Sequence, residues 1–302
     1  MKLYVIIVTY NGAIWIDNCL RSLINSNISL SLIVIDNNST DNTINKIEEY
    51  YKKVEVLKQN KNLGFGKANN IGIKYALNRG ADYIFLLNQD AWVETDTLSK
   101  LVDIADRSPD YGIISPVHIN GNNTGLDINF SNFVNPNNCP GFYSDLYMET
   151  RKDLYETKFV NAGAWLISRS CINRVGLFEP LFFLYGEDDN YIQRVYYHGY
   201  KVGIAPNAKI YHDRDERITT GNNQKHLHKT NLVTLLNVNN NIIKSYCKFF
   251  EYNFINSIKS LFLLKPLHSL NYLAELFYFS FSVVNIYRSR SKAKKGFIKN
   301  LE

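Results

Sequence analysis

Residues 1–90 carry apolar and polar positions in alternating blocks. Continuous apolar runs, typical of parallel strands covered on both faces, are separated by segments whose apolar residues recur at helical spacing. Strand and helix in this rhythm predict βαβ units with right-handed crossovers and a mostly parallel sheet. The predicted strands are 3–9, 30–35, 54–57 and 83–87, and the predicted helices are 13–25, 43–51 and 67–78, the last following an Asn/Gly loop at 60–66.

Polar clusters follow three of these strands at the point where each strand ends. They occupy 9–11, 36–38 and 88–90. The carboxyl ends of parallel strands meet at one edge of a sheet, and ligands of open α/β sheets bind there. Any single cluster fits an ordinary loop, but three in phase with the strand ends predict a binding edge.

The remainder of the chain is less regular. Residues 120–138 are rich in Asn and Gly, which predicts a long loop region over an acceptor site. A strand is predicted at 160–168, a helix at 188–198, and a strand with a turn at Pro206 at 203–212. Residues 261–287 are dense in Leu, Phe and Tyr, and the stretch 288–295 is strongly basic.

Composition narrows the class of protein. The chain has 302 residues, 45% of them hydrophobic and 21% charged, which excludes a disordered chain and a disulfide-stapled miniprotein. A net charge of +6 is too small to imply nucleic acid. The four cysteines form no C-x-x-C pair, which predicts free thiols in a reducing compartment. The apolar run at 3–8 is short for a signal peptide, so we expect a first strand and a cytosolic protein.

Seven motifs follow one another along the chain: VIIVTYNG at 5–12, VIDNNSTDNT at 34–43, NLGFGKANNIG at 62–72, FLLNQDAWV at 85–93, NAGAWLISR at 161–169, FFLYGEDDNYIQR at 182–194 and HGYKVGIAPNAKIYH at 198–212. In this order and spacing they resemble glycosyltransferase family 2, the inverting enzymes with a GT-A fold. Within that family the chain is similar to the rhamnosyltransferase-like branch that builds bacterial surface polysaccharides. The resemblance covers about residues 3–215.

The resemblance implies an α/β fold of the GT-A type, a Rossmann-like, mostly parallel sheet flanked by helices. We expect a catalytic domain at 1–225, with a nucleotide-sugar-binding half at 1–118 and an acceptor-binding half at 119–225. Residues 226–302 are predicted to form a helical, aromatic-rich and basic C-terminal extension.

A nucleotide-sugar donor requires an aromatic face and a hydrogen-bond acceptor for its flat base. Tyr10 and Asp36 follow the first two strands and can supply both, and the resemblance implies that they hold the nucleoside together with Thr9. A core tyrosine and a turn or capping aspartate remain the alternatives. Glycines let a backbone approach a phosphate or sugar closely. The further donor-binding candidates are Gly64, Gly66, Asn70 and Asn88.

A divalent cation would stabilise the charge that develops on a leaving diphosphate, and hard cations prefer carboxylate oxygen. Asp90 is the candidate ligand, in a degenerate form of the family's D-x-D motif whose first position is Asn88. His212 matches the position where family members supply a metal-binding histidine, although a lone histidine also fits a plain core or surface residue. The resemblance therefore implies Mn²⁺ or Mg²⁺ as cofactor.

Inverting transfer is a single in-line displacement in which a carboxylate takes the proton of the acceptor hydroxyl. Asp188 stands at the family's base position, and Glu187 beside it is assigned to the acceptor side. Acidic residues at a helix N-terminus also have a structural explanation, through the helix dipole. Trp165 fits either a stacking platform for an acceptor sugar or a core tryptophan.

The apolar C-terminal segment permits three arrangements: a membrane span, docking at a membrane surface, or packing on the catalytic domain or a second subunit. Residues 270–287 fall just short of the length of a span and include Glu275, and Pro266 interrupts any longer helix. The basic stretch 288–295 favours an anionic membrane surface.

Taken together, the sequence predicts an inverting, metal-dependent glycosyltransferase. It would move rhamnose or another hexose from dTDP-rhamnose or a UDP-hexose to a glycan acceptor, lipid-linked at the inner face of the cytoplasmic membrane, in capsule or O-antigen synthesis. A sugar-nucleotide nucleotidyltransferase is disfavoured because no Gly-rich, Arg/Lys-bearing loop follows the first strand. A catalytically silent glycan-binding subunit is the remaining alternative, and homo-oligomer formation stays open.

Overall fold

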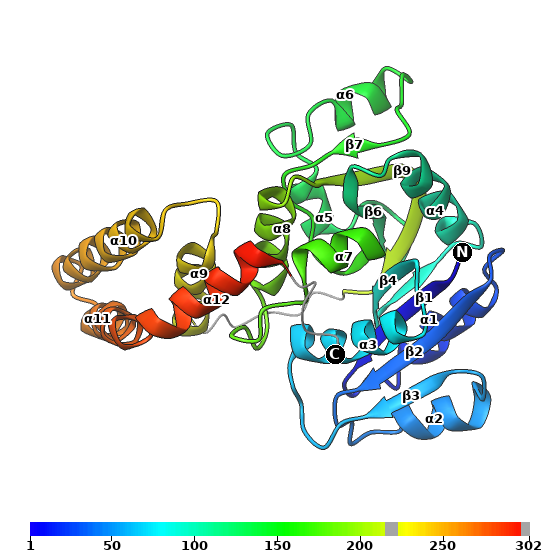
Figure 1. Cartoon of the computed structure of the whole chain (residues 1–302), viewed down its shortest axis with the longest axis horizontal. Coiled ribbons are helices and arrows are strands. Elements are labelled where there is room, and N and C mark those ends of the chain that lie inside the picture. The colour runs from blue at the N-terminus through cyan, green and yellow to red at the C-terminus, as the bar shows by residue number, and fades with distance from the viewer. Residues whose placement is uncertain (215–222, 297–302) are drawn as a thin grey trace.

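The structure is a computed structural model that describes residues 1–214 and 223–296. Its centre is a nine-stranded mixed sheet in the order β3-β2-β1-β4-β8-β6-β9-β5, with β7 pairing to β9 (Figure 1). The strands are β1 (Leu3–Thr9), β2 (Leu30–Asp36), β3 (Glu55–Lys58), β4 (Tyr83–Asn88), β5 (Ala91–Val93), β6 (Tyr111–Asn120), β7 (Tyr155–Glu156), β8 (Ala164–Ser168) and β9 (Lys201–His212).

The half of the sheet formed by β3, β2, β1 and β4 is parallel throughout. Its register places Thr9 beside Asp36 and Val8 beside Asn88, so three strand ends meet at one edge. Strand β8 then runs antiparallel between β4 and β6. The predicted α/β sheet is thus confirmed, with an antiparallel insertion that the apolar runs did not reveal.

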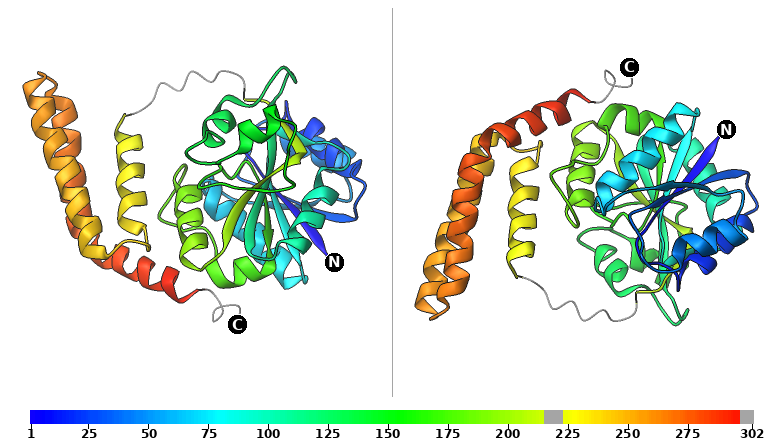
Figure 2. Two further views of the ribbon diagram at one scale, coloured as in Figure 1. Left: turned by 90° about the horizontal axis from the view of Figure 1, so that it is seen from above. Right: turned by 90° about the horizontal axis from the view of Figure 1, so that it is seen from below.

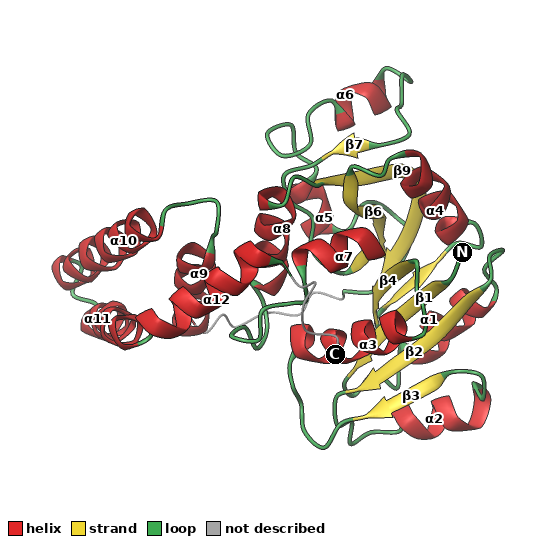
Figure 3. Cartoon of the chain, viewed as in Figure 1, coloured by secondary structure: helices red, strands yellow, loops and turns green. Residues whose placement is uncertain are grey.

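Helices cover both faces of the sheet (Figure 3). Residues that alternate along β1 point to opposite sides: Ile6 lies in one apolar cluster with α3, α7 and α8, whereas Val5 and Ile7 lie in the other with α1 and α4. The helices of this region are α1 (Ile16–Ile24), α2 (Thr43–Tyr50), α3 (Phe65–Asn78), α4 (Thr97–Arg107), α5 (Ile128–Phe133), α6 (Phe142–Tyr147), α7 (Arg169–Val175) and α8 (Glu187–Tyr197).

The predicted elements of residues 1–90 agree with the structure to within a few residues. The prediction of an unbroken loop region at 120–138 is wrong, because α5 forms there. Asp127 begins this helix by accepting a hydrogen bond from the Phe130 amide, which satisfies a free N–H at the helix start. The turn expected at Pro206 is present as an irregularity of register between β6 and β9.

The C-terminal extension is helical, as expected, and projects from the side of the sheet domain (Figure 2). It comprises α9 (Asn223–Leu236), α10 (Ile242–Phe262), α11 (Pro266–Phe281) and α12 (Val283–Lys295). Within the described residues, none of the helices combines the length and apolar character needed to cross a bilayer. The predicted domain limit at 225 falls in the first turn of α9, and the limit at 118 falls inside β6.

Candidate active site

The ends of β1 and β4 are joined by a glutamine side chain. The Oε1 atom of Gln89 accepts hydrogen bonds from Thr9 Oγ1 at 2.6 Å and from the Tyr10 amide at 2.9 Å. A Cβ at Gly12 would overlap Gln89 Oε1, so a larger residue there would displace this side chain. Thr9 is therefore a buried linker between strands, whereas the Tyr10 ring is 46% exposed and available to stack on a base.

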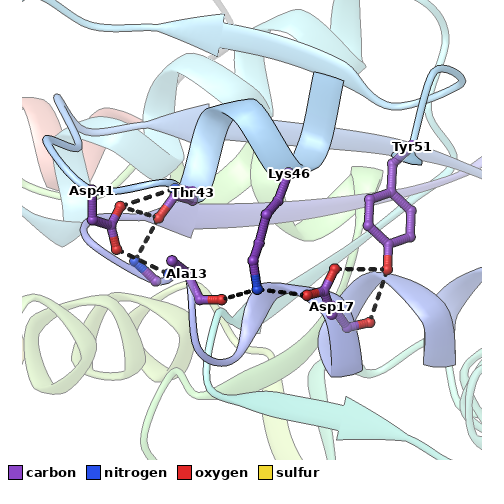
Figure 4. Close-up of polar contacts among 7 residues, drawn as sticks. Ala13, Asp17, Asp41, Thr43, Lys46 and Tyr51 are labelled. Carbon is purple, nitrogen blue, oxygen red and sulfur yellow. Dashed lines mark hydrogen bonds and ion pairs between the residues drawn. The ribbon is translucent and has the colours of Figure 1, made fainter. Parts of the chain in front are cut away.

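The loop after β1 is fixed by side chains of the first turns of α1 and α2 (Figure 4). Asp41 accepts a hydrogen bond from the Ala13 amide at 3.1 Å and another from the Thr43 amide at 3.0 Å. Lys46 donates to Ala13 O and to Asp17, both at 2.8 Å. Burial raises the pKa of Asp41, but the hydrogen bonds from Thr43 and Ala13 outweigh it and lower the pKa overall. The anionic carboxylate thus holds the loop that carries Tyr10.

Asp36 lies at the same edge, buried beside Thr9. Its carboxylate accepts from the Ser39 amide at 3.2 and 3.3 Å, the turn-forming contact that was the structural alternative for this residue. The next residue, Asn37, donates to Gly64 O at 3.3 Å and accepts from the Leu63 amide at 2.8 Å. The end of β2 is therefore tied to the start of α3.

The two candidate glycines approach protein atoms closely. Gly64 has a φ of +80°, and a side chain there would strike the carbonyl of Phe183. A Cβ at Gly66 would lie 3.1 Å from Phe178 Cβ. Asn70 makes a two-way contact with Phe178, accepting from its amide at 2.8 Å and donating to its carbonyl at 2.9 Å. These residues bring the 178–187 segment to the binding edge, so their positions have a structural cause independent of any donor.

The metal-ligand candidates lie together. His212 Nε2 is 3.2 Å from Asp90 Oδ1 and 3.4 Å from Asn88 Nδ2, and both His212 and Asp90 are buried. The two elements that carry them pair directly, since Ala91 of β5 is opposite His212 of β9. Asp90 O also accepts from the Asp213 amide at 2.8 Å.

Arg214 reaches the nitrogen of His212 that also faces Asp90. Its guanidinium Nε is 3.2 Å from His212 Nε2, and Asp90 Oδ1 is 3.2 Å from the same atom. The other ring nitrogen, Nδ1, is 4.0 Å from Asp127 Oδ2. Arg214 Nε is itself 3.8 Å from Asp127. A cationic group thus already lies against the nitrogen that faces Asp90.

This arrangement fits a divalent cation held by two protein side chains. Across 1–214 and 223–296 there is no cluster of three or more His, Cys, Asp or Glu residues suited to hold a metal. Ions such as Mg²⁺ are commonly bound by one or two carboxylates plus substrate phosphates and water, so a carboxylate with an imidazole lone pair is an adequate protein contribution. Asp90 and His212 form such a pair.

The acidic motif begins α8. Gly186 precedes it in a left-handed conformation, and Glu187, Asp188 and Asp189 occupy the first turn, where the helix dipole favours negative charge. Asp188 is half-buried and accepts a hydrogen bond from the Asp189 amide at 2.9 Å. Asp189 forms an ion pair of 3.4 Å with Lys229 of α9. The extension therefore contacts the helix that carries the candidate base.

Glu187 is buried, and its pKa is raised. Burial, followed by the charge of Asp188, raises its pKa to about 7. Its Oε2 atom has no hydrogen-bond partner within the described part of the chain. The carboxyl group of Glu187 is therefore harder to ionise than that of an exposed glutamate.

Trp165 corrects the prediction of a stacking platform. The indole is fully buried and stacks on Phe178, with ring centroids 6.2 Å apart and planes at 17°. Tyr191 covers it at 6.0 Å. With no face exposed, it cannot stack on an acceptor sugar, and the core alternative is the correct one.

Sequence reasoning missed several residues that shape the site. Gln89 lies within one of the motifs, but no role was predicted for it. The sequence gives no signal for the hydrogen bond that it accepts from Thr9, 80 residues away. Asp127 and Arg214 are brought to His212 only by the tertiary fold.

The mixed sheet, the acidic start of α8 and the carboxylate–histidine pair define an α/β glycosyltransferase of the GT-A type. The chain belongs to glycosyl transferase family 2, whose model matches residues 4–176. It is 24% identical over 213 residues to "dTDP-rhamnosyl transferase RfbF" of Shigella flexneri, covering 70% of this chain and 69% of that protein. It is 25% identical over 238 residues to "N-acetylglucosaminyl-diphospho-decaprenol L-rhamnosyltransferase" of Mycobacterium tuberculosis, covering 70% and 75%.

Solved structures support the fold. "S. aureus TarS 1-349" superposes with a TM-score of 0.59 at 18% identity, covering 94% of this chain and 74% of that one. "GalNAc-T7 with UDP, GalNAc and Mn2+" superposes with a TM-score of 0.59 at 15% identity, covering 78% and 48%. The resemblance to family 2 and to its rhamnosyltransferases is therefore confirmed, and the chain is a nucleotide-sugar-dependent glycosyltransferase.

Proposed function

We propose that this enzyme catalyses inverting transfer of rhamnose, or another hexose, from a nucleotide sugar to a lipid-linked bacterial surface glycan. The observation that supports the proposal is a series of contacts that links the ends of β1, β2 and β4 to the segment before α8. Asp36 is adjacent to Thr9, which is bonded to Gln89 beside Asp90. Asn37 continues the edge through Gly64 to the 183–188 segment.

Each group has a role that its surroundings support. Tyr10 and Asp36 would hold the nucleoside. The acceptor hydroxyl would attack the anomeric carbon while Asp188 takes its proton, and the nucleoside diphosphate would leave with the bonding electrons. The raised pKa of Glu187 favours a protonated carboxyl group, which could donate a hydrogen bond on the acceptor side. Asp90 and His212 would hold Mn²⁺ or Mg²⁺, which when bound neutralises charge on the diphosphate.

The named relatives support the finer assignment. Two of them are rhamnosyltransferases by name, and one name specifies a diphospho-decaprenol acceptor. A lipid-linked acceptor would place this enzyme peripherally at the inner face of the cytoplasmic membrane, in capsule or O-antigen synthesis. Gly64, Gly66, Asn70 and Asn88 support the donor cleft as scaffold residues in this proposal.

Asp188→Asn tests the base. We expect it to lower transfer by about a thousandfold, because removal of a positioned general base costs that order of rate. Nucleotide binding, measured by thermal shift, should persist. Asp189→Asn is the matched control and should lose about tenfold at most, since Asp189 faces Lys229. Near-normal transfer by Asp188→Asn would refute the assignment.

Asp90→Ala tests the cation site. Titration of nucleoside diphosphate in the presence and absence of Mn²⁺ should show metal-enhanced binding by the parent chain. That enhancement should disappear in Asp90→Ala and remain in Asp96→Ala, whose carboxylate pairs with Lys100 on the surface. An identical Mn²⁺ enhancement in all three proteins would exclude Asp90 as a ligand.

A further inference from the structure

The α10–α11 hairpin buries polar residues and exposes apolar ones. Its buried positions on α10 are Ser245, Phe249, Asn253 and Ser257, and on α11 they are Ser269, Glu275 and Phe279. Five of these seven residues are polar or charged. Water-soluble helix pairs bury an apolar stripe, so this distribution is the reverse of the usual one.

We call the buried residues Asn253, Ser257, Ser269 and Glu275 the polar seam. Hydrogen bonds between helices join these residues. Ser257 Oγ and Ser269 Oγ are 2.8 Å apart, joining α10 to α11. Asn253 exchanges hydrogen bonds with Asn231 of α9 at 2.9 and 3.2 Å. Asn231 also donates to the buried Glu275 at 3.1 Å. Small and amide side chains that hydrogen-bond across helices are typical of helix packing in lipid, where apolar burial gives no drive for association.

The outer surface is apolar, and most strongly so at the turn of the hairpin. We call Leu261–Leu264 together with Leu267 the apolar tip. Phe262 is 84% exposed and Leu264 is 89% exposed. Such a contiguous apolar surface on a projecting element marks an interaction site. Along the outer faces of the two helices the apolar character continues with Phe250, Phe254, Ile258, Leu270, Phe277 and Phe281.

Charge decides between a lipid surface and a second copy of the chain. From 252 to 274 the sequence contains Lys259 and Lys265 but no Asp or Glu. Two copies meeting through this surface would bring like charges together, whereas an anionic bilayer attracts each cation near its surface.

We propose that the α10–α11 hairpin is a membrane-docking element whose apolar tip inserts into the interface of an anionic lipid leaflet. The hairpin lies on the outer side of α9, away from the sheet, in both views of Figure 2. In the left view β1 runs upward from the terminus marked N, and the hairpin likewise rises from its base beside α12 to its turn. The tip is thus on the side of the molecule toward which the parallel strands end.

This orientation would turn the donor edge toward the same leaflet, and only this part of the inference rests on the proposed function. The hairpin is continuous with the catalytic helix through α9, because Lys229 of α9 pairs with Asp189 of α8. A lipid-linked acceptor held in that leaflet would then reach Asp188 while its lipid stays in the bilayer.

The test is co-sedimentation of the full chain with vesicles of phosphatidylcholine, with and without phosphatidylglycerol. Phe262→Glu combined with Leu264→Glu should weaken vesicle binding by about tenfold or more, because two inserted apolar side chains are replaced by anions. The matched control is Tyr147→Glu with Met148→Glu, an exposed apolar pair at the end of α6, which should bind like the parent. Lys259→Gln with Lys265→Gln should reduce the preference for phosphatidylglycerol and its sensitivity to salt.

Equal vesicle binding by the tip variant and the parent would overturn the proposal. So would a parent chain that ignores vesicles, whether it stays monomeric or self-associates in a way that the tip variant abolishes. Transfer to a soluble acceptor, measured without vesicles, keeps the two proposals separate. The tip variant should retain it, and a chain with no transfer at all would refute the proposed function while leaving the vesicle result intact.

Discussion

The sheet domain and the α10–α11 hairpin differ in what they bury. Val5, Ile6 and Ile7 at the centre of β1 are fully buried, whereas the hairpin encloses Asn253 and Ser257 beside Phe249 and Phe279 and exposes many of its other aromatic and aliphatic residues. Apolar burial away from water explains the first arrangement but not the exposed apolar surface of the second. Under the proposed docking, the sheet domain is adapted to water and the hairpin to the interface of a lipid leaflet.

The largest expected effect is on the free energy of unfolding, when an apolar side chain is truncated in each of the two regions. Leu86→Ala, in the middle of β4 and fully buried, should lower the free energy of unfolding by about 3 kcal/mol, through lost transfer energy and a cavity. Leu264→Ala, at the exposed tip, should change it by about 0.5 kcal/mol or less. Urea unfolding without lipid measures both. A Leu264→Ala cost equal to that of Leu86→Ala would mean that the tip is packed in solution.

A pH-dependent effect of intermediate size is expected at the junction of the two regions. The pKa of Glu187 is raised from 4.5 to about 7, chiefly by burial and then by Asp188. Below pH 4.5 the carboxyl is neutral in both folded and unfolded chains. Between pH 4.5 and about 7 it ionises in the unfolded chain before the folded one, so the folded state loses stability, and above that range the loss is complete.

Glu187→Gln removes that loss. Relative to the parent, the variant should gain about 2 kcal/mol of unfolding free energy at pH 8 compared with pH 5.5. Urea unfolding at the two pH values provides the measurement. A difference between variant and parent that stays constant with pH would show that Glu187 has an ordinary pKa in the folded chain.

The contrast between the regions also explains what could be predicted from sequence. Thr9, Asp36 and Asn88 were placed correctly on one edge, because strand period and parallel topology alone determine where strand ends meet. Trp165 was left ambiguous, because an aromatic residue beside a strand end fits core and cleft equally, and only the packing of Phe178 and Tyr191 decides.

Contacts between distant segments were beyond the sequence. The approach of Arg214 to His212 and the link from Asp189 to Lys229 depend on how whole elements pack. The reversal of the hairpin was hidden for a related reason. Apolar residues at helical spacing predict a helix, but the period is the same whether the apolar face points toward protein or away from it.

The smallest expected effect tests whether the polar seam holds the hairpin to α9. Asn253→Ala removes both hydrogen bonds with Asn231 and leaves that buried amide with only Glu275. We expect a loss of about 1 kcal/mol in unfolding free energy, since an unsatisfied buried polar group costs that order. The control is Asn256→Ala on the same helix, whose side chain donates to Tyr252 O within α10 and should cost less. Hydrogen exchange of α9 and α10 amides adds a local measurement, and it should rise in Asn253→Ala alone. Equal effects of the two substitutions would contradict a hairpin that is held to α9 by its buried polar residues.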